Sequence, residues 1–307
     1  MLRAMLPKLR HRAEAVFPQI SERWSGIRID RQHLRSFLEM TGLPSGEGIM
    51  KLGAGRGAVA SLLYPHVFGF PLLMALVTQR DVPLSLWRAL QIRNHFLLHR
   101  PYSEHEMLDL AIGVGPQRIL AKGVEVDFPM TLSVPGEVVW EGLTTFYYRG
   151  SYGQEQAASP LARPHQGDWP EVSKWAMPSR RGTSWRFAGL TGDYNGIHWW
   201  NWYARVMGFK TGLYHPQLVV GQCLARLSPP GASSTRLDVW LKGPVYRRSN
   251  VRLQATEDNG ARWFALSMDG KSRPSIVGKW SVAGPGSRLF DDHAAPLPAG
   301  NDRKAAE

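Results

Sequence analysis

The segment SFLEMTGLPSG (36–46) faces RFAGLTGDYNG (186–196) when the chain is aligned with itself at an offset of 150 residues. A second pair of segments, LLYPHVFGFPLLMALV (62–77) and GLYHPQLVVGQCLARL (212–227), keeps the same offset without a gap. Chance composition could produce a few matches, but one offset held over about 40 residues favours a gene duplication. The identical positions are Phe37/Phe187, Thr41/Thr191, Gly42/Gly192, Gly46/Gly196, Leu63/Leu213, Tyr64/Tyr214 and Ala75/Ala225.

Each half has the same expected order of elements. An almost wholly apolar stretch follows Pro65 as far as Val77, and another follows Pro216 as far as Leu227. A helix that is apolar on every side is a buried one, and proline suits the first helical turn because its missing N–H is not needed there. Strand-like segments follow at 89–98, 109–115, 117–130 and 136–149 in the first half and at 235–242, 249–257, 261–269 and 275–282 in the second.

This order predicts an α+β fold class built from two tandem units. Composition places an N-terminal unit at 1–150 and a linker rich in Gly, Pro, Ser and Ala at 151–171. A C-terminal unit is expected at 172–284, followed by a flexible tail at 285–307.

The overall composition is that of a globular protein, with 43% hydrophobic and 20% charged residues. The net charge of +12 favours anionic partners, but the basic residues form no run of the kind that binds nucleic acid, so no nucleic-acid partner is expected. The single cysteine, Cys223, lies in an apolar run, which indicates a buried packing role and no internal disulfide. The single cysteine fits a reducing cytoplasm, where we expect the protein. No stretch approaches about 18 consecutive apolar residues, so we expect no membrane span.

The stretch TGDYNGIH (191–198) holds residues that could carry chemistry. Asp193 and His198 stand five positions apart, with Asn195 between them, in a run of turn-forming residues. A carboxylate and an imidazole held close together can share one bound water, so that one group takes a proton and the other returns one to the product. An ordinary turn beside a packed histidine has the same spacing, so the spacing alone leaves both readings open.

The residue types and spacing of this stretch resemble the signature of the MaoC-like, (R)-specific enoyl-CoA hydratase family. That signature reads roughly F-A-x-x-[ST]-G-D-x-N-P-[IL]-H, followed by A-x-x-x-G-F and A-H-G-[ML]. The close match covers about 30 residues, and the duplicated layout extends the resemblance to most of the chain. The matching positions are Phe187, Ala188, Thr191, Gly192, Asp193, Asn195, Ile197, His198, Ala204, Gly208, Phe209 and His215.

The resemblance implies a double hotdog, two tandem units in which an antiparallel sheet wraps around buried helices. It implies that Asp193 and His198 are the acid/base pair, oriented by Asn195. The implied reaction is the reversible hydration of trans-2-enoyl thioesters to (3R)-hydroxyacyl thioesters in fatty-acid or related acyl metabolism. The acyl group would arrive on coenzyme A or acyl carrier protein, with no further cofactor and no metal. A homodimer of pseudo-dimers would follow the habit of closed symmetry.

Two positions depart from the family pattern. The proline expected after Asn195 is Gly196, which loosens the turn but removes no chemistry. The glycine whose N–H would bind the thioester oxygen is Pro216, and proline has no N–H. Because losing one oxyanion donor costs about 10²–10³ in rate, either the Gln217 N–H at the helix start takes over or the oxyanion hole is degraded. Gln217, Gly196 and His215 are therefore the candidate oxyanion or substrate-binding residues. His215 could also support Asp193 or simply pack.

The first half lacks the acid/base pair. At the offset of 150, Leu43 faces Asp193, Ser45 faces Asn195 and Gly48 faces His198. We therefore expect one active site per chain, with the first half shaping an acyl tunnel.

Four groups of side chains have both a functional and a structural interpretation. Arg247 and Arg248 are candidates for the coenzyme phosphates, although a solvated surface explains them as well. Of the neighbours Trp199, Trp200 and Trp202, which could line a pocket, at least two are expected in the core. His66 is expected to be structural, and the recurrence of Tyr64 and Tyr214 in both halves favours packing.

Two other functions remain open on this fold. Pro216 in the oxyanion position favours a non-catalytic acyl-thioester-binding subunit. A thioesterase is the second alternative, because a fold does not fix a reaction, and Asp193 could direct water to the thioester carbonyl there.

Overall fold

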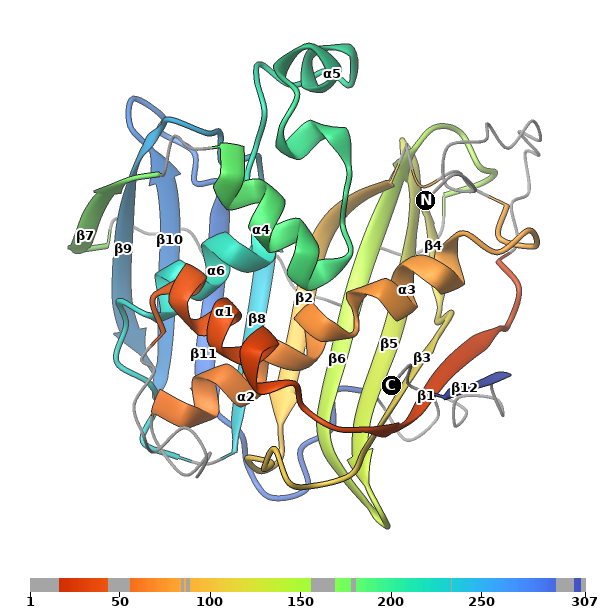
Figure 1. Cartoon of the computed structure of the whole chain (residues 1–307). Helices are drawn as coiled ribbons and strands as arrows, with labels where there is room; N and C mark the ends of the chain where they lie inside the picture. Colours follow the sequence, from red (N-terminus) through yellow and green to blue (C-terminus); the bar gives the residue numbers. More distant parts are fainter. Residues whose placement is uncertain are drawn as a thin grey trace.

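The chain forms one long, mostly antiparallel sheet with helices on one face (Figure 1). The structure is a computed structural model that describes residues 17–43, 56–83, 86, 89–155, 169–177, 181–232, 234–290 and 301–304. Its strands are β1 (Ser21–Ile27), β2 (Ala89–Leu98), β3 (Leu108–Gly113), β4 (Gln117–Leu120), β5 (Gly123–Val134), β6 (Glu137–Arg149), β7 (Glu171–Ala176), β8 (Thr235–Leu241), β9 (Asn250–Asp258), β10 (Ala261–Met268), β11 (Ile276–Val282) and β12 (Asn301–Lys304).

The strand order joins the two halves edge to edge. It runs β12-β1-β3-β5-β6-β2-β8-β11-β10-β9-β7, with β4 paired to β5 off this path. The first-half strands β1 to β6 therefore lie on the β2 side of this order, and the second-half strands β7 to β11 lie on the β8 side. The exception is β12, which comes last in the chain but pairs with β1 at the first-half end of the sheet. The β2–β8 junction is antiparallel and pairs Arg93 with Trp240 at one end and Leu98 with Thr235 at the other. The predicted double-hotdog α+β fold is confirmed by this layout.

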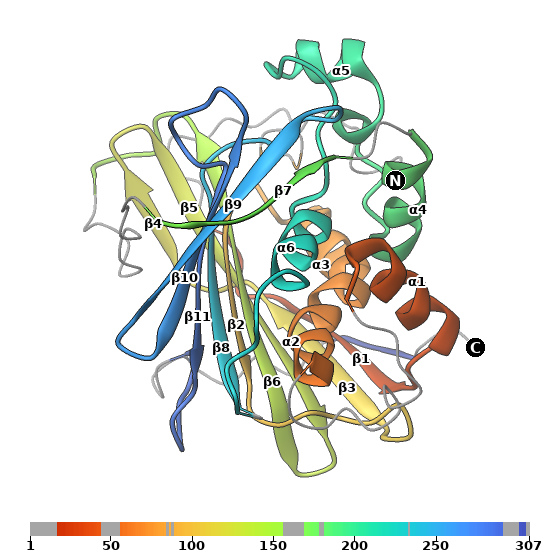
Figure 2. The same cartoon turned by 90° about the vertical axis from the view of Figure 1, so that its left-hand side faces the viewer.

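The helices cover a single face of the sheet (Figure 2). They are α1 (Arg31–Thr41), α2 (Arg56–Phe68), α3 (Phe70–Val77), α4 (Arg181–Thr191), α5 (Asn201–Val206) and α6 (Pro216–Leu224). Both views show α5 standing away from this layer, at one end of the molecule. Every residue of α6 from Gln217 to Leu224 is buried, as expected for a helix that is apolar on all sides.

The repeat predicted from the sequence is visible in the helix ends. Helices α1 and α4 have bounds 150 residues apart. Thr41 Oγ1 donates to the Phe37 carbonyl at 2.8 Å and Thr191 Oγ1 to the Phe187 carbonyl at 3.2 Å. Each helix is followed by a left-handed glycine, at φ +74° for Gly42 and +65° for Gly192, a conformation that glycine adopts without strain. The two halves thus share a local structure as well as a pattern.

Most of the predicted strands are present with small shifts at their ends. The segment 117–130 was predicted as one strand, but it contains two, β4 and the start of β5, which form a hairpin. Three strands were not predicted: β1, β7 and β12. Strand β12 pairs in parallel with β1 and lies within the segment 285–307 that was predicted as a tail. The unit boundaries at 150, 171 and 284 stay predictions.

The apolar stretch of the first half differs from its prediction. Helix α2 begins at Arg56, so Pro65 lies inside the helix and not in its first turn, whereas Pro216 does begin α6. Ala60–Val77 has a mean hydropathy of 1.6 and is long and apolar enough to cross a membrane, contrary to the expectation that no such stretch exists. Because 78% of it is buried inside the protein, it is weak support for a membrane span.

Two buried histidines predict that acid destabilises the fold. Burial lowers the pKa of His66 to about 3; burial, followed by the charge of His198, lowers that of His215 to about 3. Unfolded histidine titrates near 6.5. Between about pH 6.5 and 3 the unfolded chain therefore binds protons that the folded chain does not. The free energy of unfolding consequently decreases as the pH is lowered through this window. We expect the thermal midpoint to fall over this window, with a smaller slope in His66→Gln. An identical slope in the variant would contradict this assignment.

Candidate active site

Asp193 is brought out of helix α4 by a tight turn. Gly192 adopts the left-handed conformation directly after the helix, and a Cβ at this position would lie 3.1 Å from Pro71 Cγ. The Asp193 N–H donates to Thr191 Oγ1 at 3.2 Å. The turn is therefore held by its own helix end and lies against α3 of the first half.

Asn195 connects the two members of the predicted pair. Its N–H donates to Asp193 Oδ1 at 3.1 Å. Its side-chain Oδ1 accepts from the Ile197 N–H at 3.2 Å and caps the short 3₁₀ turn Gly196–His198. One residue thus fixes the carboxylate through its backbone and the histidine turn through its side chain.

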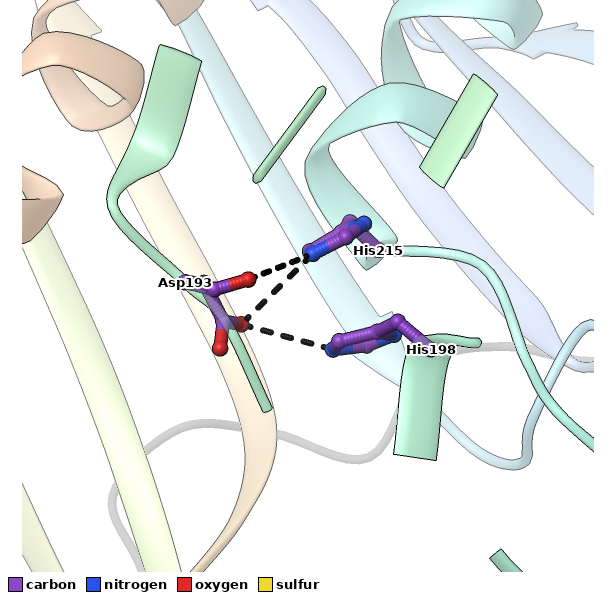
Figure 3. Close-up of side chains that lie close together, drawn as sticks. All are labelled: Asp193, His198 and His215. Atoms are coloured by element: carbon purple, nitrogen blue, oxygen red, sulfur yellow. Dashed lines mark hydrogen bonds and ion pairs between the residues drawn. The ribbon is translucent and has the colours of Figure 1, made fainter. Parts of the chain in front are cut away.

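Asp193 and His198 face each other, as the sequence predicts (Figure 3). His198 Nε2 lies 3.4 Å from Asp193 Oδ2. His198 Nδ1 lies 3.0 Å from the Leu213 carbonyl, which can only accept, so Nδ1 carries a proton. In neutral His198 the Nε2 lone pair then points at a carboxylate, and a water donating one hydrogen to each would bridge them. In the imidazolium form, Nε2–H pairs with the carboxylate directly.

His215 contacts both members of this pair. Its ring stacks on that of His198 with centroids 3.7 Å apart, and it is fully buried. His215 Nε2 donates to the Asp193 carbonyl at 3.1 Å and lies 4.0 Å from Asp193 Oδ2. The predicted support of Asp193 by His215 therefore has a direct geometric basis.

The surroundings keep Asp193 ionised. Burial alone would raise its pKa, but the hydrogen bond and charge of His198, the charge of His215 and the Asn195 N–H together lower the pKa to about 2. The side chain remains 20% exposed. At neutral pH the Asp193 side chain is thus deprotonated.

A cavity of about 920 Å³ extends from the pair. It is mainly apolar and is lined by both halves of the chain. The second half contributes the catalytic loop and aromatic rings, and the first half contributes residues from α3 and β2 that the sequence alone did not single out. The first-half lining includes Phe70, Met74, Ala75, Thr78 and Ile92. This agrees with the expectation that the first half shapes a tunnel.

The start of α6 forms part of the cavity wall. Pro216 and Val219 line the cavity, whereas Gln217 is not among its lining residues. Gln217 is buried, and its backbone N–H lies in the first turn, where N–H groups have no partner within the helix. The role of that N–H as the oxyanion donor stays a prediction.

Gly196 lies in close packing rather than in a loosened turn. A Cβ there would come within 2.9 Å of the Trp200 ring and 3.0 Å of the Tyr203 ring. The absence of a side chain lets the two rings approach the histidine turn, so the departure from the family's proline has a steric explanation.

Two groups of side chains differ from the expectations for them. Arg247 is buried, and its Nη2 donates to the Trp199 carbonyl and to Asn201 Oδ1, which argues against a role at a coenzyme phosphate; Arg248 is exposed. At least two of the three tryptophans were expected in the core, and this is wrong. Trp199 is buried, but Trp200 is 49% and Trp202 62% exposed, because the segment that carries them stands away from the sheet.

The remaining positions of the comparison between halves are only partly described. Leu43, which faces Asp193 in the repeat, is buried in the core, while Ser45 and Gly48 lie outside the described residues. Cys223 is buried as predicted, and burial raises its pKa to about 12.

Among the residues that the structure describes, one cluster could hold a metal ion. Donor atoms of Asp193, His198 and His215 all lie within 4.8 Å of one another. Two of the imidazole nitrogens, His198 Nδ1 and His215 Nε2, already form hydrogen bonds to backbone carbonyls. The expectation of no metal stays a prediction.

We expect Asn195→Ala to lower the turnover number about tenfold or more, because the cap that holds the His198 turn is lost. The backbone N–H to Asp193 remains, so the carboxylate keeps its place. Steady-state kinetics on an enoyl thioester measures this effect. Asn195→Asp, which restores an acceptor for the Ile197 N–H, should recover part of the rate; equal losses in both variants would contradict the capping role.

Comparisons with known proteins show which proteins this chain is similar to in sequence and in fold. No protein-family model matches the chain. It is 26% identical over 251 residues to 3-hydroxyacyl-thioester dehydratase X of Mycobacterium tuberculosis, covering 81% of this chain and 84% of that protein. A crystal structure of the same dehydratase, HtdX, superposes with a TM-score of 0.69 at 22% identity, covering 86% of this chain and 100% of that one.

Two other solved structures agree on the fold. A MaoC-like dehydratase from Phytophthora capsici gives a TM-score of 0.68 at 15% identity over 88% of this chain and 97% of that one. A conserved hypothetical protein of Mycobacterium tuberculosis with a double hotdog fold gives 0.51 at 12% identity over 87% and 98%. The resemblance predicted from the motif is therefore confirmed: along most of its length the chain is similar to the MaoC-like dehydratases of the double-hotdog branch.

Proposed function

We propose that the chain is a hydro-lyase that interconverts (3R)-hydroxyacyl and trans-2-enoyl thioesters. The observation that carries this proposal is the placement of Asp193 Oδ2 and His198 Nε2, 3.4 Å apart, in the wall of a mainly apolar cavity. The similarity to a protein named 3-hydroxyacyl-thioester dehydratase X supports the same reaction class.

The pair can carry both proton transfers of a dehydration. The ionised Asp193 carboxylate takes the C2 proton, and the electrons of that C–H bond form the C2=C3 double bond. The imidazolium of His198 gives its Nε2 proton to the C3 oxygen, which leaves as water with the electrons of the C3–O bond. Return of the proton from Asp193 to His198 restores the pair, and hydration follows the same steps in reverse.

Charge develops on the thioester oxygen while C2 carries negative charge. First-turn N–H groups and the positive end of a helix dipole stabilise such charge, and α6 begins at the cavity wall. We place the thioester carbonyl there, with the Gln217 N–H as its donor. Coenzyme A and acyl carrier protein both present the same thioester arm, and the proposal covers both.

The experiment that tests the proposal follows the ultraviolet absorbance of the enoyl thioester with crotonyl-CoA and with a longer trans-2-enoyl-CoA. Loss of the band with a (3R)-hydroxyacyl product supports the proposal, and a (3S) product overturns its stereochemistry. Free thiol release without hydration would instead indicate a thioesterase. Binding of both ligands without turnover would indicate a non-catalytic acyl-thioester-binding subunit, in which Pro216 leaves the oxyanion site without its N–H donor.

A further inference from the structure

An exposed apolar surface, mostly aromatic, adjoins the cavity. Trp185 is 59% exposed, Trp200 49%, Trp202 62% and Val206 76%. We call these four residues the aromatic knob. Large exposed apolar patches on a soluble protein mark a binding surface, whereas single exposed hydrophobic residues need no explanation.

The knob is continuous rather than scattered. Trp185 lies 5.2 Å from Trp199, Trp199 lies 6.2 Å from Trp200, and Trp200 stacks on Trp202 at 6.2 Å, all between ring centroids. Val206 follows Trp202 by one turn of α5, which places both on one side of the helix. Figures 1 and 2 show α5 standing out from the body of the protein, so the surface is convex.

The base of the knob is held firmly. Arg247 donates to the Trp199 carbonyl and to Asn201 Oδ1, and the Gly212 N–H donates to the same Asn201 oxygen at 3.2 Å. A buried arginine is thus used to fix the segment that presents the tryptophans. The rings are held outward by structure and are not left exposed by a loose loop.

The knob adjoins the entrance to the candidate active site. Trp185 and Trp200 line the cavity and are also about half exposed or more, so they stand at its mouth. Trp202 and Val206 are not among the lining residues and extend the apolar surface outward from it.

The segment that carries the knob has a net positive charge. Within 181–215 the basic residues are Arg181, Arg186, Arg205 and Lys210, and Asp193 is the only acidic residue. Arg205 and Lys210 are exposed; Arg186 is exposed and lies 3.8 Å from Glu39. Tryptophan favours the boundary between lipid headgroups and acyl chains, and neighbouring cations favour anionic headgroups.

We propose that the aromatic knob docks the protein on the surface of an anionic phospholipid bilayer. The rings of Trp200 and Trp202 and the side chain of Val206 enter the headgroup region, and Arg205 and Lys210 contact the phosphates. A convex surface tipped with tryptophan and edged with cations suits penetration of a headgroup layer. In this orientation the mouth of the cavity faces the bilayer.

The test is co-sedimentation of the full chain with phosphatidylcholine vesicles and with vesicles that also contain phosphatidylglycerol. We expect binding to the anionic vesicles that is stronger than to the neutral ones and that weakens at high salt. Trp202→Ser with Val206→Ser should weaken it at least tenfold. The matched control, Val172→Ser with Val282→Ser, removes two exposed apolar side chains from β7 and β11 and should bind like the wild type.

Two results would overturn the proposal. One is wild-type protein that stays in the supernatant with both kinds of vesicle. The other is a dimer in sedimentation velocity that the Trp202/Val206 variant dissociates, with no vesicle binding, because the knob would then be an interface between copies of this chain. Circular dichroism and turnover of crotonyl-CoA confirm that the variant is folded, because neither residue lines the cavity.

Discussion

Asp193→Asn is expected to lower the rate of enoyl-thioester hydration about 10³-fold and to leave the fold intact. General acid–base catalysis contributes typically about 10²–10⁴ to a rate, and an amide cannot take the C2 proton. The amide oxygen still accepts the Asn195 N–H, so the turn is kept. His198→Gln should cost a similar factor. Because the two groups act on one pair of proton transfers, the double variant should be little slower than either single one.

A second buried Asp–His pair provides the control. His95 Nδ1 lies 2.6 Å from Asp238 Oδ1 at the junction of β2 and β8, and neither residue lines the cavity. Asp238→Asn therefore removes the same charge from a similar buried pair without touching the candidate site. It should lower the thermal midpoint and leave turnover within a few-fold of the wild type. If it slows turnover as much as Asp193→Asn, the loss reflects damage to the fold and not the loss of a catalytic group.

The parts of the site that could be predicted from sequence are those made by local structure. Asp193, Asn195 and His198 lie within six residues, and the hydrogen bonds that join them run through the same short turn. Turn-forming residues favour local geometry of this kind through their own backbone conformations and short-range hydrogen bonds. The repeat pairs Gly42 with Gly192, and in the structure these two glycines follow α1 and α4 in the same left-handed conformation.

The parts that were missed depend on contacts between distant segments. Helix α3 reaches the cavity because β2 and β8 join the two halves into one sheet. No local sequence pattern predicts that pairing. Arg247 looks like a phosphate ligand in sequence, yet it is buried against Trp199 and Asn201. Strands β1 and β7 lie near or at the ends of the sheet, where alternation of apolar residues is weakest and packing decides the structure.

Ala75→Trp is expected to remove activity on long acyl chains and to spare short ones. Ala75 lies in α3 and lines the cavity together with Met74 and Thr78. Pro71 at the start of α3 lies against Gly192, next to the catalytic turn. Ala75 follows Pro71 by four residues, or about 6 Å along the helix axis. An indole at Ala75 would therefore block the cavity beyond the reacting carbons and leave the Asp193–His198 pair untouched.

The size of the effect follows from the apolar surface that is lost. Each buried methylene contributes about 0.8 kcal/mol, so excluding four of them costs about 3 kcal/mol, or more than 100-fold in kcat/KM. The measurement compares crotonyl-CoA with a trans-2-dodecenoyl thioester. Crotonyl turnover should change only a few-fold, because its acyl group ends before the new ring. Arg80→Trp adds the same side chain at an exposed position after α3 and should leave kcat/KM unchanged for both substrates.

The comparison of the two substrates also decides which end of the cavity holds the acyl chain. If α3 lines the acyl tunnel, only the long substrate is excluded, and the first half of the chain sets the chain-length limit for a site whose reacting groups all lie in the second half. If Ala75→Trp slows both substrates equally, α3 instead lines the path of the pantetheine arm, which every thioester shares. The acyl group would then extend towards Trp185 and Trp200, and those rings would set its length.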